Sequence, residues 1–324
     1  MHDIRNVMEI GSIKITILRA AAIIGAVLLF VGGPDHYSPR SLKALWDLGH
    51  IVFFYVLSTL ILLAWPRDKK IGLLRQFAAL MLISLILSIS IELAQAGLHR
   101  TADVMDAGRN LVGSLVAFAF TARPNKTTPT SYLRSTQALS ILLVIFAIVP
   151  LVKAAADEWT ARQQFPVLSD LETPFEIDRW SGDAALSIDH AVHSQGKSSL
   201  RVTLNPSLYS GVKLRYFPGN WRHYNFLYFS VFNPLEEPIT ITCRIHDRLH
   251  AESSQAYDDR FNESFLVSKG WHHIKISLDK VARSPKKRKL DLGQIEEIGI
   301  FAMRLPAQTT IYIDNVFLSK RSPP

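Results

Sequence analysis

The chain has 324 residues, which suggests two domains, and 48% of them are hydrophobic, a high share for a water-soluble protein. Its formal net charge of +8 does not indicate nucleic-acid binding, because no nucleic-acid motif accompanies it and basic residues beside membrane spans give the same excess. The single cysteine, Cys243, excludes an internal disulfide.

Five long apolar segments predict transmembrane helices in the first half of the chain. They cover approximately 13–32, 48–65, 71–93, 104–122 and 138–154, and about 20 residues are needed to cross the hydrocarbon core. No small-residue cleavage site follows the first segment, so we interpret it as a retained span and not as a signal peptide. The expected order is an N-terminus at 1–12, a four-span domain at 13–125, and a loop with a fifth span at 126–156.

Basic residues indicate the orientation of these spans. The connection after the second segment carries Arg67, Lys69 and Lys70, and the connection after the fourth carries Arg123 and Lys126. Because cytoplasmic loops are rich in Lys and Arg, both connections and the N-terminus are predicted to be cytoplasmic. We therefore expect a multi-pass protein of a bacterial cytoplasmic membrane, with membrane lipids around it, no nucleic-acid partner, and everything beyond the fifth span outside (periplasmic).

Polar and ionisable residues gather at the predicted outer ends of the second, third and fourth spans. Counting 1.5 Å per residue places them at a similar depth in the outer leaflet. Ionisable groups inside a membrane are costly and usually functional, so we predict an outward-facing polar pocket there. Its candidate residues are Asp47, His50, Glu92, Gln95, Arg100, Asp103, Asp106 and Asn110.

This pocket has two interpretations. In one, His50 acts as a general base and Arg100 holds a phosphate or carboxylate, chemistry that would suit a lipid-linked glycan precursor. In the other, the residues form a structural network in which Arg100 pairs with an acid, and Gly108 and Gly113 let helices approach closely. Because HExxH, GxSxG and P-loop motifs are absent, no catalytic residue is assigned, and we expect a non-enzymatic protein.

The spacing Glu92-x-x-Gln95, followed by the later polar positions and Gly113, with Asp47-x-x-His50 upstream, resembles the VanZ-like family of bacterial membrane proteins. The resemblance covers approximately residues 15–125. It implies a role in the cell envelope at the outer face of the cytoplasmic membrane.

Alternating strands predict an all-β sandwich over 175–320, which a linker at 157–174 joins to the membrane half. A short helical stretch is expected near 279–283. The predicted strands are 199–204, 211–216, 226–232, 238–245, 271–278, 295–301 and 310–318.

Four segments of this half resemble the jelly-roll, galactose-binding-like carbohydrate-binding modules. They are Phe175-Glu176, 196–202, 270–278 and 311–318. The resemblance implies a sugar-binding face in which aromatic rings stack on sugars and polar groups read hydroxyls. The candidates are Trp221, Tyr224, His246, Asp247, Arg248, Tyr257 and Arg260. The alternatives are that Trp221 and Tyr224 pack in the core or its rim, and that 246–248 is a solvated turn.

Two acidic residues, Glu176 and Asp314, match the positions at which this fold often holds a structural calcium ion. No other cofactor is expected. The basic run at 283–289 is expected to be a solvated loop, or to rest on anionic headgroups or on an acidic polysaccharide.

The sequence thus predicts a multi-domain membrane protein, an all-α bundle of about five spans followed by a β-sandwich that binds a glycan in envelope or exopolysaccharide processes. Two alternatives stay open. One is an enzyme that acts on a lipid-linked glycan precursor at the outer leaflet. The other is a scaffold for an envelope export or assembly system.

Overall fold

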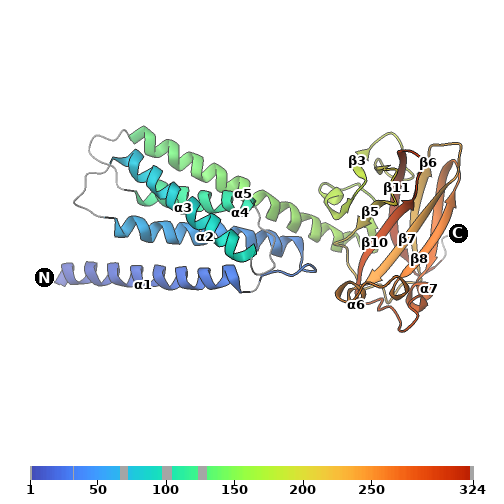
Figure 1. Cartoon of the computed structure of the whole chain (residues 1–324), viewed down its shortest axis with the longest axis horizontal. Helices are drawn as coiled ribbons and strands as arrows, with labels where there is room; N and C mark the ends of the chain where they lie inside the picture. The colour runs from blue at the N-terminus through green and yellow to red at the C-terminus, as the bar shows by residue number, and fades with distance from the viewer. Residues whose placement is uncertain (1, 32, 66–71, 97–103, 123–129, 322–324) are drawn as a thin grey trace. The chain divides into compact units, whose positions relative to one another are not determined.

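The computed structural model divides the chain into two compact units, Met1–Val152 and Lys153–Pro324 (Figure 1). It describes residues 2–31, 33–65, 72–96, 104–122 and 130–321. The first unit is helical and the second is built on β-strands, as the change in residue pattern along the sequence predicts.

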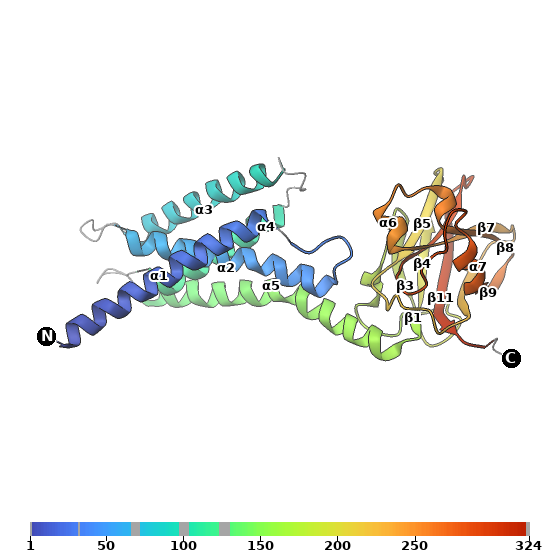
Figure 2. The same ribbon diagram turned by 90° about the horizontal axis from the view of Figure 1, so that it is seen from below.

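Five long helices account for the first unit and the start of the second, and α1 to α4 run alongside one another (Figures 1 and 2). Four of the helices in the described residues are long and apolar enough to cross a membrane: α1, α2, α3 and α5. The bounds are α1 His2–Phe30, α2 Arg40–Ala64, α3 Leu73–Ala96, α4 Val104–Thr121 and α5 Thr130–Gln164. The five predicted segments therefore all form helices, and four of them have the hydropathy of a span.

Helix α4 differs from the others because it is short and polar at its start. It has 18 residues, and Asp106, Arg109 and Asn110 occupy its first two turns. It packs along α2, and Gly113 makes this close approach possible, because a Cβ added there would lie 2.3 Å from the backbone oxygen of Ile51. At Gly108 a Cβ would meet no atom within 4 Å, so only one of the two predicted glycine contacts is present.

Helix α5 continues through the first part of the predicted linker and ends at Gln164. Its last turns belong to the second unit, where Asp157 and Arg179 form an ion pair whose side chains are both 0% exposed. Arg179 Nε and Nη2 donate to the Asp157 carboxylate over 2.8–3.1 Å, and Arg179 Nη1 donates to Leu168 O at 2.9 Å. This pair attaches the end of the helix to the strands.

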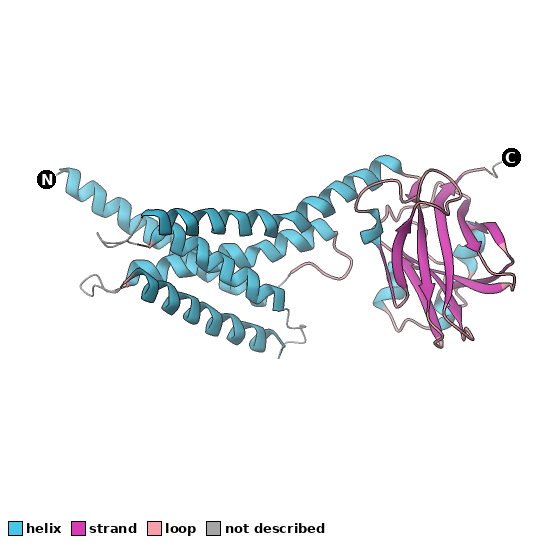
Figure 3. Ribbon diagram, turned by 90° about the horizontal axis from the view of Figure 1, so that it is seen from above, coloured by secondary structure: helices cyan, strands magenta, loops and turns pink. Residues whose placement is uncertain are grey.

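Two antiparallel sheets form the sandwich (Figure 3). All seven predicted strands are present, and β1, β2, β3 and β8 are additional. The first sheet has the order β3 (Ala185–Asp189), β4 (Ser199–Leu204), β11 (Thr309–Ser319), β6 (Phe226–Asn233) and β9 (Gly270–Ser277), with β1 (Val167–Ser169) beside β11. The second has the order β2 (Trp180–Gly182), β5 (Tyr209–Leu214), β10 (Ile295–Met303), β7 (Ile239–Asp247) and β8 (Phe261–Val267).

Short helices lie in the connections of the sandwich. They are η1 Glu176–Arg179, α6 Arg248–Glu252, η2 Tyr257–Asp259 and α7 Leu278–Arg283. The last of these confirms the helical stretch predicted near 279–283.

The core lies between the sheets and is made of the inward-facing residues of both. Leu200, Phe229, Ile245 and Ile300 are at most 1% exposed, and burial of each such side chain contributes roughly 1.5–3 kcal/mol. Cys243 is also 0% exposed, and its burial raises the pKa of the thiol. The sandwich therefore has an apolar core of its own.

Candidate functional site

The polar residues of the membrane half meet at the contact of α2 with α4. His50 is 5% exposed, and its Nδ1 lies 3.1 Å from Asn110 Oδ1 while its Nε2 lies 3.5 Å from Asp106 Oδ2. Arg109 forms an ion pair with Asp106 and places its Nη2 3.2 Å from Asp47 Oδ2. The two helices are thus joined by a series of ion pairs and hydrogen bonds.

A row of small hydroxyl and amide groups continues this contact toward α3. Asn110 Nδ2 donates to Ser88 Oγ at 2.8 Å, and Ser114 Oγ donates to Ser84 Oγ at 2.8 Å. Ser58 Oγ of α2 donates to Ser114 Oγ at 2.9 Å. Each of these polar groups finds its partner on a neighbouring helix, which favours the network interpretation over a pocket open to a substrate.

The remaining residues of the predicted pocket lie elsewhere. Gln95 Nε2 donates to Leu29 O of α1 at 2.8 Å, and Glu92 is 9% exposed on α3. Arg100 and Asp103 lie outside the described residues. Among the described residues, Arg109 pairs with both Asp47 and Asp106, and the sequence interpretation did not select it. A cavity of about 510 Å³ that reaches His50 is lined mostly by apolar residues of α1 and α2.

In the sandwich, a groove of about 710 Å³ crosses the outer face of the five-stranded sheet. Its floor residues alternate with core residues along the strands, as Phe301 does between the buried Ile300 and Ala302. The groove is lined by Ser181, Gly182, Asp183, Tyr209, Ser210, Gly211, Val212, Lys213, Thr242, Arg244, Tyr257, Arg260, Asn262, Ser264, Gly299, Phe301 and Met303.

Three aromatic rings stand on this groove. Tyr209 is 58% exposed and meets Phe301 edge to face, with 6.0 Å between the ring centroids. Tyr257 is 72% exposed, and the guanidinium of Arg260 lies 5.5 Å from the centre of its ring. Exposed rings beside polar groups can stack on the apolar face of a sugar while the polar groups bind its hydroxyls.

The floor of the groove holds polar atoms that the protein leaves without hydrogen-bond partners. Among the described residues, Arg244 Nε, Arg260 Nε and Asn262 Oδ1 are buried and accept or donate no hydrogen bond. Arg244 lies over Gly299, where a Cβ would come within 3.2 Å of Arg244 Nε, and its Nη2 forms an ion pair with Glu297. Unpaired buried polar atoms are costly, so their concentration in one groove suggests a ligand or bound water.

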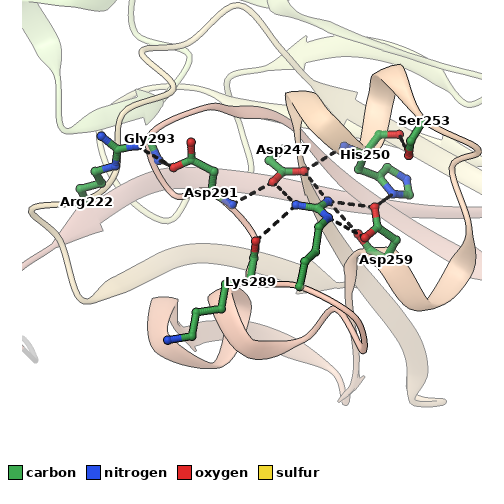
Figure 4. A network of polar contacts seen from close by, with 9 residues as sticks. Arg222, Asp247, His250, Ser253, Asp259, Lys289, Asp291 and Gly293 are labelled. Carbon is green, nitrogen blue, oxygen red and sulfur yellow. Dashed lines mark hydrogen bonds and ion pairs between the residues drawn. The ribbon is translucent and has the colours of Figure 1, made fainter.

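Tyr257 and Arg260 reach the groove from the segment 248–260, which joins β7 to β8. Arg288 holds this segment against the end of β7 by pairing with Asp247 and Asp259, which are labelled in Figure 4. Its Nη1 and Nη2 donate to Asp247 at 2.5 and 2.8 Å, and its Nε and Nη2 donate to Asp259 at 2.6 and 2.8 Å.

Further contacts complete this network. Asp247 Oδ1 also accepts the backbone N–H of His250 at 3.0 Å and so caps α6. Asp247 Oδ2 accepts the N–H of Asp291 at 2.8 Å, and His250 Nδ1 lies 3.2 Å from Asp259 Oδ2 (Figure 4). The strand end, the segment 248–260 and the loop around 288–291 are therefore fixed to one another.

The charges of this network shift its pKa values. Burial alone would raise the pKa of Asp247, but hydrogen bonds from Arg288, Asp291 N–H and His250 N–H lower it overall. Hydrogen bonds from Arg288 likewise lower the pKa of Asp259. Burial lowers the pKa of His246, whose ring lies 4.9 Å from that of His250, to about 4, so it is neutral at pH 7.

Only some of the predicted sugar-binding residues line the groove. Tyr257 and Arg260 line the groove, whereas His246 does not line it and is only 8% exposed, with its ring against that of His250. Trp221 is 0% exposed, with its Nε1 donating to Pro218 O at 3.1 Å, so it belongs to the core and cannot stack on a sugar. The alternative interpretation, core packing, is the one the structure supports.

The other three predicted residues have structural partners instead. Tyr224 is half-buried against Phe165, with 5.3 Å between the ring centroids. Asp247 is 0% exposed within the Arg288 network, so it cannot bind a ligand directly. Arg248 pairs with Glu252 on α6 and does not line the groove. The predicted solvated loop at 283–289 likewise needs correction at Arg288, which is engaged by two carboxylates.

Several groove residues escaped the sequence interpretation, above all Tyr209, Lys213, Arg244 and Phe301. They occupy outward-facing alternate positions of strands 211–216, 238–245 and 295–301 or adjoin these strands, so the alternation of the sequence predicts that they face outward. The alternation does not predict which of the two sheets has a groove on its outer face.

The two acidic residues predicted to hold calcium each accept hydrogen bonds from backbone N–H groups. Glu176 Oε1 accepts the N–H groups of Asp170 and Leu171 at 2.7 and 2.9 Å, and Asp314 Oδ2 accepts those of Ser194 and Gln195 at 2.6 and 3.0 Å. Asp314 Oδ1 has no partner in the described part of the chain.

These carboxylates therefore hold loops in place, and the calcium site stays a prediction. The described ranges contain no group of three acidic, histidine or cysteine side chains that could hold a metal ion. Calcium takes six to eight oxygen ligands, and backbone carbonyls can be among them.

No family model matches the chain, and no curated protein matches it either. The resemblance of the helical half to the VanZ-like family therefore stays a prediction.

The C-terminal half resembles solved carbohydrate-binding modules. One is the family 11 module from Clostridium thermocellum in complex with a β-1,3-1,4-mixed-linked tetrasaccharide, with 16% identity, coverage of 49% of this chain and 96% of that chain, and a TM-score of 0.38. Another is in the xylanase 10B CBM22-1–GH10 modules of the same organism complexed with xylohexaose, with 14% identity, coverage of 49% and 28%, and a TM-score of 0.34.

An exo-β-agarase matches with 17% identity, coverage of 48% of this chain and 25% of that chain, and a TM-score of 0.38. These are likenesses in the arrangement of the strands, and they do not tell what the groove of this chain binds.

Proposed function

We propose that the β-sandwich binds a glycan chain in the groove of its five-stranded sheet, and that the apolar helices hold it at a membrane. The observation that carries this proposal is the groove itself. It combines the exposed rings of Tyr209 and Tyr257 with the half-buried polar side chains of Arg244, Arg260 and Asn262. This combination of apolar platform and convergent polar groups is what a sugar chain requires.

The proposal has a membrane part and a binding part. The four apolar helices support insertion into a membrane. The basic connections predicted from the sequence support a cytoplasmic N-terminus and a sandwich outside the cytoplasmic membrane, where envelope glycans and exopolysaccharides occur. His50 is buried between Asp106 and Asn110, a setting that favours a structural role for the helical half over catalysis.

The binding part is tested with the purified full-length chain in detergent on an array of envelope and plant polysaccharides. Tyr257→Ala and Tyr209→Ala each remove a ring from the groove. We expect each to weaken binding of the best glycan by roughly 0.5–1.5 kcal/mol, a factor of about 2 to 12. Equal binding by the wild type and by the double variant would show that the glycan does not bind in the groove.

Tyr312→Ala is the matched control. Tyr312 is a tyrosine on the outer face of the other sheet, where it packs on Phe232 with 5.8 Å between the ring centroids. It should leave binding unchanged. If Tyr312→Ala reduces binding while Tyr257→Ala does not, the glycan lies on the six-stranded sheet instead.

A further inference from the structure

The cations of the groove outnumber its acids. Lys213, Arg244 and Arg260 line it, together with the single acid Asp183. Asp183 is already engaged, because its Oδ1 accepts the N–H of Gly211 at 3.0 Å. Of the three cations, Arg244 has a carboxylate partner in Glu297.

Arg260 is the unusual one. It is half-buried, and its guanidinium carbon lies 5.5 Å from the centre of the Tyr257 ring. It forms no ion pair with any residue that the structure describes, and its Nε is buried without an acceptor. Burial, followed by repulsion from Arg244, lowers the pKa of the guanidinium. Glu297 offsets this lowering in part, and an anion bound in the groove would stabilise the charge further.

The shape of the guanidinium group suggests the shape of this anion. A carboxylate can bind an arginine through two parallel N–H···O bonds from its planar fork. Arg260 Nε is enclosed, but the side chain as a whole is only half-buried and lines the groove beside the exposed ring of Tyr257. A sugar that stacks on Tyr257 would therefore bring a ring substituent within reach of Arg260.

We propose that the groove selects an acidic glycan, one whose sugars carry a carboxylate or sulfate group, and that Arg260 binds this anionic group while the ring of Tyr257 stacks on the sugar that bears it. This inference rests on the proposed glycan-binding function and adds the class of ligand. Arg260 is the residue that distinguishes acidic from neutral chains, because it alone among the groove arginines lacks an acidic partner in the described residues.

The test uses the full-length protein in detergent and three uronate polymers, polygalacturonate, alginate and hyaluronan. Each is compared with its own carboxyl-reduced form, which keeps the chain and loses the charge. A sulfated dextran beside unmodified dextran distinguishes sulfate from carboxylate. We expect at least one acidic polymer to bind about tenfold or more tightly than its neutral counterpart, the gain of one charge-assisted pair.

Two substitutions locate the effect. Arg260→Gln should abolish the preference and leave the affinity for neutral chains, and Arg260→Lys, which keeps the charge without the two-pronged edge, should retain part of it. Arg283→Gln is the control, because it removes the same charge from an exposed position on α7 outside the groove. A melting temperature close to that of wild type confirms that each variant is folded.

The possible failures are distinguishable. If neutral and acidic chains bind equally and Tyr257→Ala weakens both, the inference is wrong while the proposed glycan-binding function stands. If Arg283→Gln reduces acidic binding as much as Arg260→Gln, the attraction is diffuse and the inference is wrong. If no polymer binds at millimolar concentration, both the inference and the proposed function are rejected.

Discussion

Arg288 joins Asp247 to Asp259 through four hydrogen bonds of 2.5–2.8 Å, and so connects the end of β7 to the segment that carries Tyr257 and Arg260. Neither Arg288 nor its two partners lines the groove. Arg288 is therefore a positioning residue. It would affect ligand binding by holding the segment 248–260 in place.

Arg288→Gln should weaken glycan binding and destabilise the sandwich together. The substitution leaves Asp247, which is 0% exposed, without its counterion, and we expect a loss of about 3 kcal/mol in the free energy of unfolding. Affinity should fall about tenfold because Tyr257 and Arg260 lose their fixed position. Denaturant unfolding and glycan titration measure the two effects. Reduced stability with unchanged affinity would contradict the positioning role.

The buried pair of Asp157 and Arg179 makes the end of α5 necessary for the sandwich. Asp157→Asn should lower the free energy of unfolding by about 3–5 kcal/mol, because Arg179 would be a buried charge without a partner. Glu158→Gln removes the same charge from the neighbouring position of α5 and should have a small effect. Equal effects of the two substitutions would contradict this prediction. A fragment that begins at residue 165 should be destabilised for the same reason.

Mild acid should destabilise the sandwich through His246, which is neutral in the folded state. Burial lowers the pKa of His246 to about 4 from an unfolded value near 6.5, so between these values the unfolded state binds more protons and stability falls as the pH is lowered. The full shift corresponds to up to ~3 kcal/mol. Unfolding free energies at pH 7, 5.5 and 4 measure this slope. His246→Gln should make the unfolding free energy less dependent on pH. An equally steep pH dependence in that variant would show that other groups cause it.

Chelation should leave the sandwich unchanged. Because Asp314 and Glu176 accept hydrogen bonds from backbone N–H groups, we expect EDTA and added calcium to give the same melting temperature. Asp314→Ala should cost roughly 1–3 kcal/mol, since the N–H groups of Ser194 and Gln195 lose their acceptor. A drop of several degrees on adding EDTA would contradict this expectation and support the calcium hypothesis.

The contact between α2 and α4 should tolerate no side chain at Gly113. The Cβ of Gly113→Ala would lie 2.3 Å from the backbone oxygen of Ile51, so the helices would have to separate and strain the His50–Asn110 contact. Gly108→Ala, where nothing lies within 4 Å, is the matched control. Thermal unfolding in detergent should show a lower midpoint for the first variant only. A normal midpoint for Gly113→Ala would indicate that this packing is adjustable.

Period-two alternation predicted seven of the strands because their inward positions are strongly apolar, as in Ser199–Leu204. It missed β8, whose residues Asn262, Glu263 and Ser264 are polar on both sides, and it missed the short edge strands. The hydropathy pattern likewise predicted the helices, because apolar runs of this length are typical of membrane-spanning helices.

The site was harder to predict because its residues are chosen by three-dimensional position. Trp221 and Tyr257 are both aromatic residues in connections between strands, yet Trp221 fills the core and Tyr257 is 72% exposed. Arg288 lies in a run of basic residues that looks solvated, and only the fold brings Asp247 and Asp259 to it. Local sequence does not contain these long-range contacts.

The single thiol at Cys243 gives a means of observing one unit of this chain by itself. It lies in the core of the sandwich, and burial raises its pKa, so a thiol reagent can reach and modify it only when the sheets open. No other cysteine exists in the sequence to compete for the reagent. The labelling rate of the intact protein in a bilayer would therefore report the opening of the sandwich alone, and protection by a bound glycan would measure its affinity without a modified probe.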